Sequence, residues 1–302
     1  MSTCILIPTY DRYRPIAEFT ISMLERYWPK HPPVYLCGCK NNTTSQYLAL
    51  KDDPRDWIGI LHSAAEDLIN AGHDKAYLII DDCPPLFECN EQHLGETIPG
   101  LLDRVSASYI SLIGWDQRRE PDSGGEILGG DLWRVQRQSE DFLWRYSAGP
   151  GIWRLEALRD ILAVLVPTEN PMSRSAWAFE RRLGRNEVAL PERWRNSSYR
   201  IYGWGMLGGR FSMLRRVSRQ TAYRLYDLCR FVLRFTAGKQ TLTRFDSLVS
   251  IETSLYDGPY PTYWAGLMTK GELNPNVVKY LAFHRRTDYL GDLRAAVERV
   301  QK

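Results

Sequence analysis

Short apolar runs alternate with amphipathic stretches along the first third of the chain. The runs that are hydrophobic on both faces and short enough for strands are residues 4–8, 34–38, 75–81 and 107–113. The stretches with apolar residues at helical spacing are residues 15–27, 57–69 and 94–105. Strands that are apolar on both faces and alternate with helices are typical of an α/β fold. The pattern therefore predicts a mainly parallel, twisted sheet with helices on both faces.

The rest of the chain continues with more irregular spacing. Residues 116–140 are polar and glycine-rich, which indicates a long surface loop or a small hairpin. The remaining predicted elements are strands at 142–146 and 199–203 and helices at 155–165, 176–183, 215–237 and 288–300. We therefore expect one main α/β domain over residues 1–210 and a C-terminal helical extension, 211–302, packed on it.

Composition and charge narrow the class of protein. The 302 residues are 44% hydrophobic and 12% aromatic, which suffices for a packed core. Basic and acidic side chains nearly balance, 39 against 36, and a net charge of +3 does not predict a nucleic-acid partner. The first residues lack the basic start and apolar run of a signal peptide, and no window has ~18–20 consecutive apolar residues. We therefore expect a cytoplasmic protein.

The six cysteines do not predict a disulfide framework in a chain of this length. Four cysteines could together bind zinc: Cys37, Cys39, Cys83 and Cys89. Neither the pair Cys37 and Cys39 nor the pair Cys83 and Cys89 has the spacing of a CxxC knuckle. We therefore expect reduced and mostly buried thiols.

Polar side chains follow the predicted parallel strands at the places where ligands usually bind. In open α/β sheets, ligands bind beyond the carboxyl ends of the strands. The residues directly after the first three strands are Pro8, Thr9, Tyr10, Asp11 and Arg12, then Lys40 with Asn41 and Asn42, and then Asp81 and Asp82. These residues are the candidates for a ligand site at one edge of the sheet.

The Asp81-Asp82 pair has two interpretations. Adjacent carboxylates at the end of a buried strand repel each other, and burial raises that cost. A divalent cation removes the cost and takes oxygen ligands from carboxylates and phosphates together. Alternatively, the pair is a solvated strand end that caps the next turn. The doublet by itself does not decide between a metal site and a cap.

Four segments, taken in order, resemble GT-A glycosyltransferases of the family 2 type. They are Cys4-Ile-Leu-Ile-Pro-Thr-Tyr-Asp-Arg12, Tyr77-Leu-Ile-Ile-Asp-Asp-Cys83, Ser147-Ala-Gly-Pro-Gly-Ile-Trp-Arg-Leu-Glu-Ala-Leu158 and Trp177-Ala-Phe-Glu-Arg-Arg-Leu183. The resemblance implies a GT-A fold in which residues 1–115 bind a nucleotide-sugar and residues 116–210 complete the catalytic domain. One departure is that the acidic motif is Asp-Asp-Cys, whereas the family has Asp-x-Asp.

The resemblance also implies a role for each candidate residue. Glu180 is the implied catalytic base, Asp82 and His284 the metal ligands for Mn or Mg, and Gly149 and Trp177 contacts to the sugar or acceptor. The implied nucleotide-binding residues are Pro8, Thr9, Tyr10, Asp11, Arg12, Lys40 and Asp81. The implied reaction transfers a sugar from a nucleotide-diphosphate sugar to a cell-surface glycan or lipid-linked acceptor, with inversion.

Several of these residues have ordinary structural interpretations as well. Glu180 is also placed to pair with a neighbouring arginine at the surface, and Trp177 to pack in a core. Lys40 also fits a polar turn, and His284, beside two arginines, also fits a surface position. The aromatic segment 258–274 either lines the acceptor site or packs in the core. The sequence leaves these alternatives open.

Residues 215–237 combine an apolar stripe with arginines elsewhere on the helical wheel. The stripe is Val217, Thr221, Leu225, Leu228, Val232 and Phe235, and the arginines are Arg216, Arg219, Arg230 and Arg234. This pattern is typical of a helix that lies in a membrane surface with anionic lipids, which predicts a peripheral position on the inner face of the cell membrane. The alternative is that the stripe packs on the main domain.

Three further functions remain compatible with the sequence. The first is a sugar transferase that modifies DNA, although the weak net charge makes a nucleic-acid partner unlikely. The second is a protein that binds nucleotide-sugars without turnover. The third is a nucleotidyltransferase, but the glycine-rich phosphate loop that such enzymes usually carry near the N-terminus is not visible in the sequence.

Overall fold

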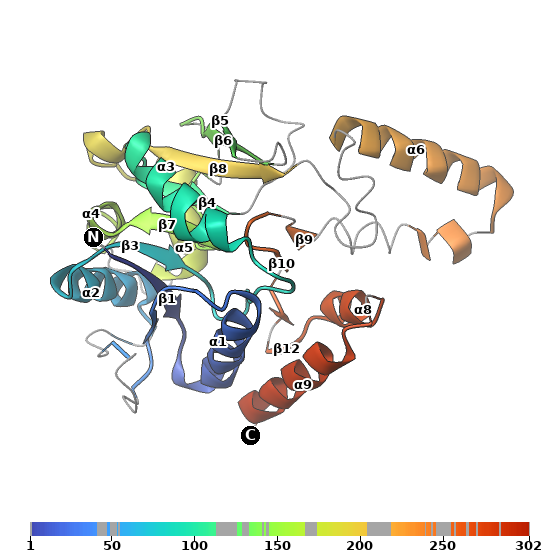
Figure 1. Ribbon diagram of the computed structural model, residues 1–302, viewed down its shortest axis with the longest axis horizontal. Helices are drawn as coiled ribbons and strands as arrows, with labels where there is room; N and C mark the ends of the chain where they lie inside the picture. Colours follow the sequence, from blue (N-terminus) through green and yellow to red (C-terminus); the bar gives the residue numbers. More distant parts are fainter. Residues whose placement is uncertain are drawn as a thin grey trace.

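The computed structural model is described for most of the chain. The described residues are 2–40, 47–48, 53, 55–112, 126–128, 133–140, 142, 145–166, 174–203, 219–238, 240–242, 244–245, 255–256, 258–263, 266–269, 271–283 and 285–301. In this part of the chain, eight strands form one sheet in the order β2-β1-β3-β7-β4-β8-β6-β5 (Figure 1). Helices cover both faces of this sheet, so the predicted α/β fold is confirmed.

In the first third of the chain, the strands of the large sheet overlap the predicted apolar runs, although the third strand ends at Leu78 and not at Asp81 as predicted. Their bounds are β1 Ser2–Pro8, β2 Val34–Cys37, β3 His73–Leu78, β4 Tyr109–Ser111, β5 Glu126–Leu128, β6 Trp133–Arg137, β7 Gly151–Arg154 and β8 Ser198–Gly203. β5 and β6 form an antiparallel pair within the polar segment 116–140, as a small hairpin there would require.

The sheet is mixed but mainly parallel in strand direction. β1 pairs in parallel with both β2 and β3, and β4 pairs in parallel with β8. β7 runs antiparallel between β3 and β4, and β6 runs antiparallel to both β8 and β5. Following these pairings across the sheet gives six strands in one direction and two, β6 and β7, in the other. The prediction of a mainly parallel sheet is therefore confirmed.

One layer of helices packs on each face of the sheet. The helices are α1 Arg14–Tyr27, α2 Trp57–Asn70, α3 Ile98–Arg104, α4 Leu155–Ala163 and α5 Ala176–Gly184. Cys4 and Leu6 of β1 face α2, α4 and α5, whereas Ile5 and Ile7 face α1 and α3. The alternation of side chains along a strand explains how one apolar run supplies both cores.

The C-terminal helices pack on the outer side of α1. They are α8 Pro275–Phe283 and α9 Thr287–Gln301. Ile16 and Met23 of α1 share a core with Val277 of α8 and Leu293 of α9, so α1 is buried on two sides. Two short hairpins precede these helices: β9 Leu255–Tyr256 with β10 Thr262–Tyr263, and β11 Met268–Thr269 with β12 Glu272–Leu273.

Two local predictions were wrong. The described residues of the predicted strand 142–146 form bends, and the strand in this region is β7, which starts at Gly151. The proline at position 150 and the helix that starts at Leu155 leave only four residues for β7, too few to show a strand pattern. In the predicted helix 94–105, the first turn is a π-helix at His93–Thr97, and α3 begins only at Ile98.

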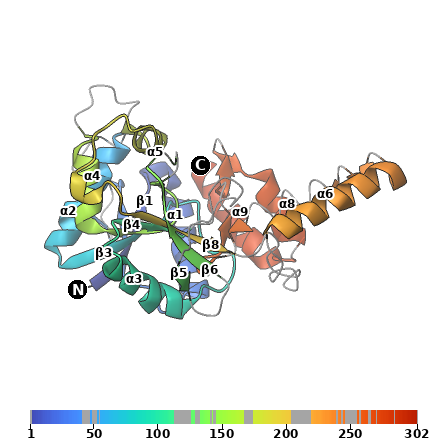
Figure 2. The same ribbon diagram turned by 90° about the horizontal axis from the view of Figure 1, so that it is seen from above.

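The basic helix α6, Arg219–Thr236, lies away from the sheet and its covering helices. Figures 1 and 2 both show it extending to the side of the molecule. The apolar side chains Leu225, Leu228, Phe231, Val232 and Phe235 of α6 are exposed. The interpretation that the stripe packs on the main domain is therefore wrong for these residues, because nothing in the described structure buries them. Val217 lies outside the described residues.

Candidate functional site

The candidate site lies at the edge of the sheet where the parallel strands end. In the register, Pro8 at the end of β1 is opposite Cys37 at the end of β2, and Leu6 is opposite Leu78 at the end of β3. The strands therefore finish side by side, and the residues that follow them share one edge. Asp81 comes three residues after β3 and lies in a turn at this edge.

Asp81 is held in place by two threonines. The Thr9 hydroxyl donates a hydrogen bond of 2.8 Å to Asp81 Oδ2, and the Thr20 hydroxyl of α1 donates to the Asp81 backbone carbonyl. Only 8% of the Asp81 surface is exposed. Burial, followed by the charge of Asp82, raises the pKa of Asp81 above its ordinary value of 3.8. The carboxylate is thus fixed in position while its charge is disfavoured.

Asp82 is enclosed by a segment from the distant C-terminal part of the chain. The Leu267 N–H donates to the Asp82 carbonyl at 2.8 Å, and the Met268 N–H donates to its carboxylate. Burial raises the pKa of Asp82 above its ordinary value, and hydrogen bonds to the carboxylate from the Met268 N–H and the Cys83 thiol partly offset that rise. Gly266 has φ +74°, and its backbone lies so close that a Cβ there would collide with the Asp82 carboxylate.

The same C-terminal segment continues along residues 83–90. The Tyr260 hydroxyl donates to the Cys83 carbonyl at 2.9 Å, and the Thr262 hydroxyl donates to the Pro84 carbonyl at 2.8 Å. Tyr260 is fully buried. The described residues of the aromatic segment 258–274 therefore pack beside the acidic pair, and the buried rings of Tyr260 and Tyr263 belong to the core.

Glu180 lies in the middle of α5, which is capped at its N-terminus by Ser175. The Ser175 hydroxyl accepts the Ala178 N–H at 3.2 Å. Glu180 Oε1 accepts two hydrogen bonds of 2.7 Å, one from the Ser147 hydroxyl and one from the Ala148 N–H. Burial raises the pKa of Glu180 above its ordinary value, and these two hydrogen bonds offset part of that rise. The interpretation of Glu180 as one half of a surface ion pair is wrong, because its described partners are Ser147 and Ala148.

The antiparallel strand β7 brings Glu180 toward the acidic pair. Gly151, the first residue of β7, is paired with Leu78 at the end of β3 on one side and with Ser111 of β4 on the other. The segment 147–149, which holds Glu180, therefore enters the sheet at the same edge at which β3 leaves it. A parallel strand in this place would have put that segment at the opposite edge.

The buried Cys83 thiol directly follows the acidic pair in the sequence. Burial raises the pKa of Cys83 well above its ordinary range, and the charges of Asp82, Asp81 and Glu180 raise it further. The geometric link between Glu180 and the acidic pair, which are about a hundred residues apart in the sequence, is the pairing of Gly151 with Leu78.

Arg200 of β8 provides a positive charge that acts on Glu180. Arg200 is almost fully buried, and its charge lowers the pKa of both Glu180 and Tyr109. The Arg200 guanidinium also lies 4.8 Å from the centre of the Phe142 ring. A buried cation near the base candidate favours the ionised form of Glu180 and counteracts the effect of burial.

The candidates after β1 and β2 line the outer side of this edge. Tyr10 is 45% exposed, and its ring centre is 4.7 Å from that of Tyr13. Burial of its hydroxyl end raises the pKa of Tyr10, and the charge of Asp81 contributes to the rise. The Lys40 N–H donates to Asp11 Oδ1 at 2.8 Å, so the residues after β1 and β2 are joined. Arg12 and Lys40 are exposed.

Three other candidates have different outcomes. Trp177 is 75% exposed on α5, so the alternative that it packs in the core is wrong. Gly149 is buried in the segment between Ser147 and β7, beside the groups that bind Glu180. His284 lies outside the described residues.

The donor set at the acidic pair fits a hard divalent cation that shares its ligands with a substrate. Asp81 and Asp82 offer carboxylate oxygens, the ligands that Mn²⁺ and Mg²⁺ prefer. Within the described residues, no group of three or more His, Cys, Asp or Glu side chains is arranged to hold a metal. An ion held by this pair would take its remaining ligands from phosphate and water, as Mg²⁺ commonly does.

The zinc hypothesis finds no support among the described side chains. Cys37, Cys39, Cys83 and Cys89 are buried free thiols. Burial raises the pKa of each of these thiols, and that of Cys39 to about 11. Within the described residues, no group of three or more metal-binding side chains includes these cysteines.

The sequence did not single out several residues that build the site. Thr20 left a signal, because it is a polar residue on the apolar face of a predicted helix, four positions after Ile16. Gly266 and Met268 left none, since their relation to Asp82 depends on contacts between residues about 185 positions apart. Arg200 lies in a predicted strand, but nothing in the pattern separates a buried arginine from an exposed one.

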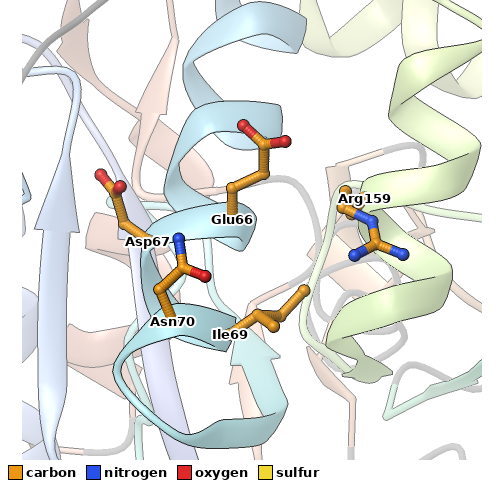
Figure 3. A pocket seen from close by; sticks show the side chains of 5 residues that line it. All are labelled: Glu66, Asp67, Ile69, Asn70 and Arg159. Atoms are coloured by element: carbon orange, nitrogen blue, oxygen red, sulfur yellow. The ribbon is translucent and has the colours of Figure 1, made fainter.

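A separate hollow lies between α2 and α4, at the other edge of the sheet. Figure 3 shows it lined by Glu66, Asp67, Ile69 and Asn70 of α2 and by Arg159 of α4. These α2 residues precede β3, whereas Asp81 follows it, so the hollow is not part of the candidate site. Arg159 is paired with Asp160 at 2.8 Å.

Comparison with known proteins gives distant structural likenesses only. No model of a protein family matches the sequence, and no curated protein matches it. The structure is similar to A197 from STIV, with 11% identity over 67% of this chain and 82% of that chain, and to TarS 1–349 of S. aureus, with 12% over 84% and 70%. It is also similar to the galactosyltransferase LgtC in complex with donor and acceptor sugar analogs, with 13% over 72% and 96%. The TM-scores are 0.33, 0.33 and 0.32, so function is inferred below from the site itself.

Proposed function

We propose that this protein is a glycosyltransferase that moves a sugar from a nucleotide-diphosphate donor to an acceptor hydroxyl. One observation carries the proposal: Gly151 of β7 pairs with Leu78 of β3, so the segment that binds Glu180 and the turn that holds Asp81 and Asp82 share the carboxyl edge of the sheet. Asp81 and Asp82 suit a cation that would in turn bind a diphosphate. Glu180 is hydrogen-bonded separately, to Ser147 and Ala148. The GT-A resemblance of the motifs agrees with this division of roles.

The donor side of the proposed site is the Asp81-Asp82 turn. The raised pKa values of both aspartates mean that their negative charges lack compensation in the protein alone. Asp81 and Asp82 would hold a Mn²⁺ or Mg²⁺ ion, which would supply that compensation and positive charge for the departing diphosphate. Thr9 and Thr20 hold Asp81 in place beside Asp82.

The outer residues of the same edge are proposed to hold the nucleotide. Tyr10 presents an exposed ring beside Asp81, and Asp11 and Lys40 join the ends of β1 and β2. An aromatic ring offers a stacking face for a base, and Arg12 or Lys40 offers positive charge for phosphate.

Glu180 is proposed as the general base of an inverting transfer. The acceptor oxygen forms a bond to the anomeric carbon while the bond between that carbon and the diphosphate oxygen breaks. The electron pair of the broken bond leaves with the diphosphate, and Glu180 takes the proton of the acceptor hydroxyl. Ser147 and Ala148 fix Oε1 of Glu180, and Oε2 is the oxygen proposed to take that proton.

Trp177 marks the proposed acceptor side. It lies three residues before Glu180 on α5, about one helical turn away, and is exposed. Its indole is a stacking surface for a sugar ring of a glycan or lipid-linked acceptor. The base and the acceptor platform would then share one rigid helix.

The proposal is tested by following release of nucleoside diphosphate from a panel of nucleotide-sugars with Mn²⁺ or Mg²⁺. Slow donor hydrolysis by water is expected even without the natural acceptor, and Asp82→Asn is expected to abolish it. Trp177→Ala is expected to retain hydrolysis and weaken use of a sugar acceptor. Donor binding with no release under any condition, and no effect of Glu180→Gln, would instead indicate a protein that binds nucleotide-sugars without turnover.

A further inference from the structure

α6 carries a large apolar face that is exposed to solvent. Five large side chains, Leu225, Leu228, Phe231, Val232 and Phe235, are each 48–73% exposed. At 100° per residue they fall within about 120° of the helix circumference. The rings of Phe231 and Phe235 lie 4.9 Å apart and form a continuous apolar surface. Such a contiguous patch indicates an interaction surface.

The stretch of sequence that contains α6 is much more positively charged than the rest of the chain. Residues 210–244 contain nine arginine or lysine side chains and one aspartate, a net charge of +8. The rest of the chain holds the other 30 basic and 35 acidic side chains, a net charge of −5. The overall value of +3 therefore hides a strongly basic segment centred on α6. A partner for this segment is expected to be anionic.

The combination of an apolar face and positive charge favours one class of partner. A second copy of α6 would supply a matching apolar face but would also bring a second set of positive charges against the first. A nucleic acid would satisfy the charges but leave the leucine and phenylalanine side chains in water. A bilayer with anionic headgroups satisfies both, because its acyl chains accept the apolar face and its headgroups attract the arginines.

The described part of the chain contains no helix that is long and apolar enough to cross a membrane. A helix of 18 residues with one apolar face is suited to lie along the surface. We propose that α6 docks this protein on an anionic lipid bilayer, with Leu228, Phe231 and Phe235 inserted at the level of the acyl chains. Docking would keep the enzyme at the surface where lipid-linked acceptors are found, but it does not depend on the proposed sugar transfer.

The experiment measures sedimentation of the purified full-length protein with vesicles. One set is pure phosphatidylcholine, and the other contains about 30% phosphatidylglycerol. The protein is expected to partition onto the anionic vesicles and to remain in solution with the neutral ones. Soluble glycerol phosphate is not expected to compete, because it provides the headgroup charge without an acyl layer.

Three variants separate the apolar and charge contributions. The triple variant Leu228→Gln, Phe231→Gln and Phe235→Gln is expected to lower the partition coefficient by more than about 100-fold, since three apolar side chains no longer insert into the bilayer. Arg230→Gln with Arg234→Gln is expected to lower it by about tenfold to thirtyfold. The matched control, Lys279→Gln with Arg294→Gln, removes the same charge from exposed sites on α8 and α9 and is expected to leave it unchanged.

Folding of each variant is checked by its circular dichroism and melting temperature, because exposed substitutions should leave both unchanged. Failure of the wild-type protein to bind anionic vesicles would overturn the proposal. So would equal loss of binding in the α8 and α9 control. Binding of duplex DNA that depends on the α6 arginines but not on the apolar side chains would assign the segment to nucleic acid. A dimer that the triple variant converts to a monomer, without vesicle binding, would assign it to a second copy.

Discussion

The Ser147 hydroxyl donates a 2.7 Å hydrogen bond to Oε1 of Glu180, although the two residues are 33 positions apart and lie in different elements. Ser147 precedes β7, and Glu180 lies on α5. The bond ties the base candidate to the antiparallel strand whose first residue is paired with the end of β3. The position of Glu180 relative to the acidic turn is thus set by the topology of the sheet.

Replacing Glu180 tests the proposed base directly. Glu180→Gln keeps an oxygen that accepts the bonds from Ser147 and Ala148 but cannot take a proton. Transfer is expected to fall by about 10²–10⁴-fold with donor affinity unchanged, because a general base contributes that much to the rate. Rates and donor Kd are measured on the same preparations. Ser147→Ala is the companion variant and is expected to have a smaller effect, since the Ala148 N–H still holds Oε1.

The pH dependence of the rate follows from the raised pKa of Glu180. A base must be deprotonated to act, so the rate is expected to fall as the pH drops through that pKa, which lies above the ordinary 4.5. Arg200 lowers this pKa, so Arg200→Met is expected to move the acid limb of kcat/KM to higher pH, and Arg200→Lys to restore part of the shift. An unmoved acid limb in a folded Arg200→Met protein would exclude this electrostatic contact.

The acidic pair is expected to cost stability when no cation is bound. The pKa of Asp81 is higher in the folded chain than its ordinary 3.8, so its stabilising contribution is complete below that value and is lost as the pH rises through the folded pKa. In metal-free buffer at about pH 8.5, Asp81→Asn is therefore expected to melt at least ~2–4 °C above the wild type. At about pH 4 the melting temperatures of the two proteins should be nearly equal, because Asp81 is then neutral in the folded protein. A lower Tm for Asp81→Asn at the higher pH would contradict the account.

The C-terminal segment is expected to control Asp82. Gly266→Ala places a Cβ against the Asp82 carboxylate, and Gly72→Ala is a matched control with φ +88° and no atom within 4 Å of the added group. Both variants should lose about 1–2 kcal/mol from the positive φ. Only Gly266→Ala is expected to lose, in addition, the rise in Tm that Mn²⁺ and a nucleoside diphosphate produce. Equal responses in both variants would remove Asp82 from the ligand site.

The elements of the first third were predictable because their signals are local. A run such as Cys4-Ile-Leu-Ile shows its two buried faces in a few residues, and α1 and α2 show their helical spacing over 14 residues each. The position of Asp81 and Asp82 followed from one general rule about the carboxyl ends of parallel strands. No contact between distant residues was needed for these conclusions.

The rest of the site depends on contacts that a sequence pattern does not contain. β7 is four residues long, and its antiparallel direction is set by pairing with β3 and β4, about 75 and 40 positions away. The approach of residues 266–268 to Asp82 is likewise a property of the packed chain. The sequence pattern of α6 left two interpretations open. The exposure of its apolar side chains contradicts packing on the main domain, and the membrane-surface interpretation stays a proposal.

The most direct test of the central claim is the melting temperature with each of UDP, GDP, CDP and dTDP, with and without Mn²⁺. One nucleoside diphosphate is expected to raise Tm, more so with the cation, because ligands that bind the folded state stabilise it. Asp82→Asn is expected to lose the cation-dependent part of that rise. No shift of the wild-type protein with any of the four, in the presence or absence of Mn²⁺, would contradict the assignment of this sheet edge as a nucleotide-sugar site.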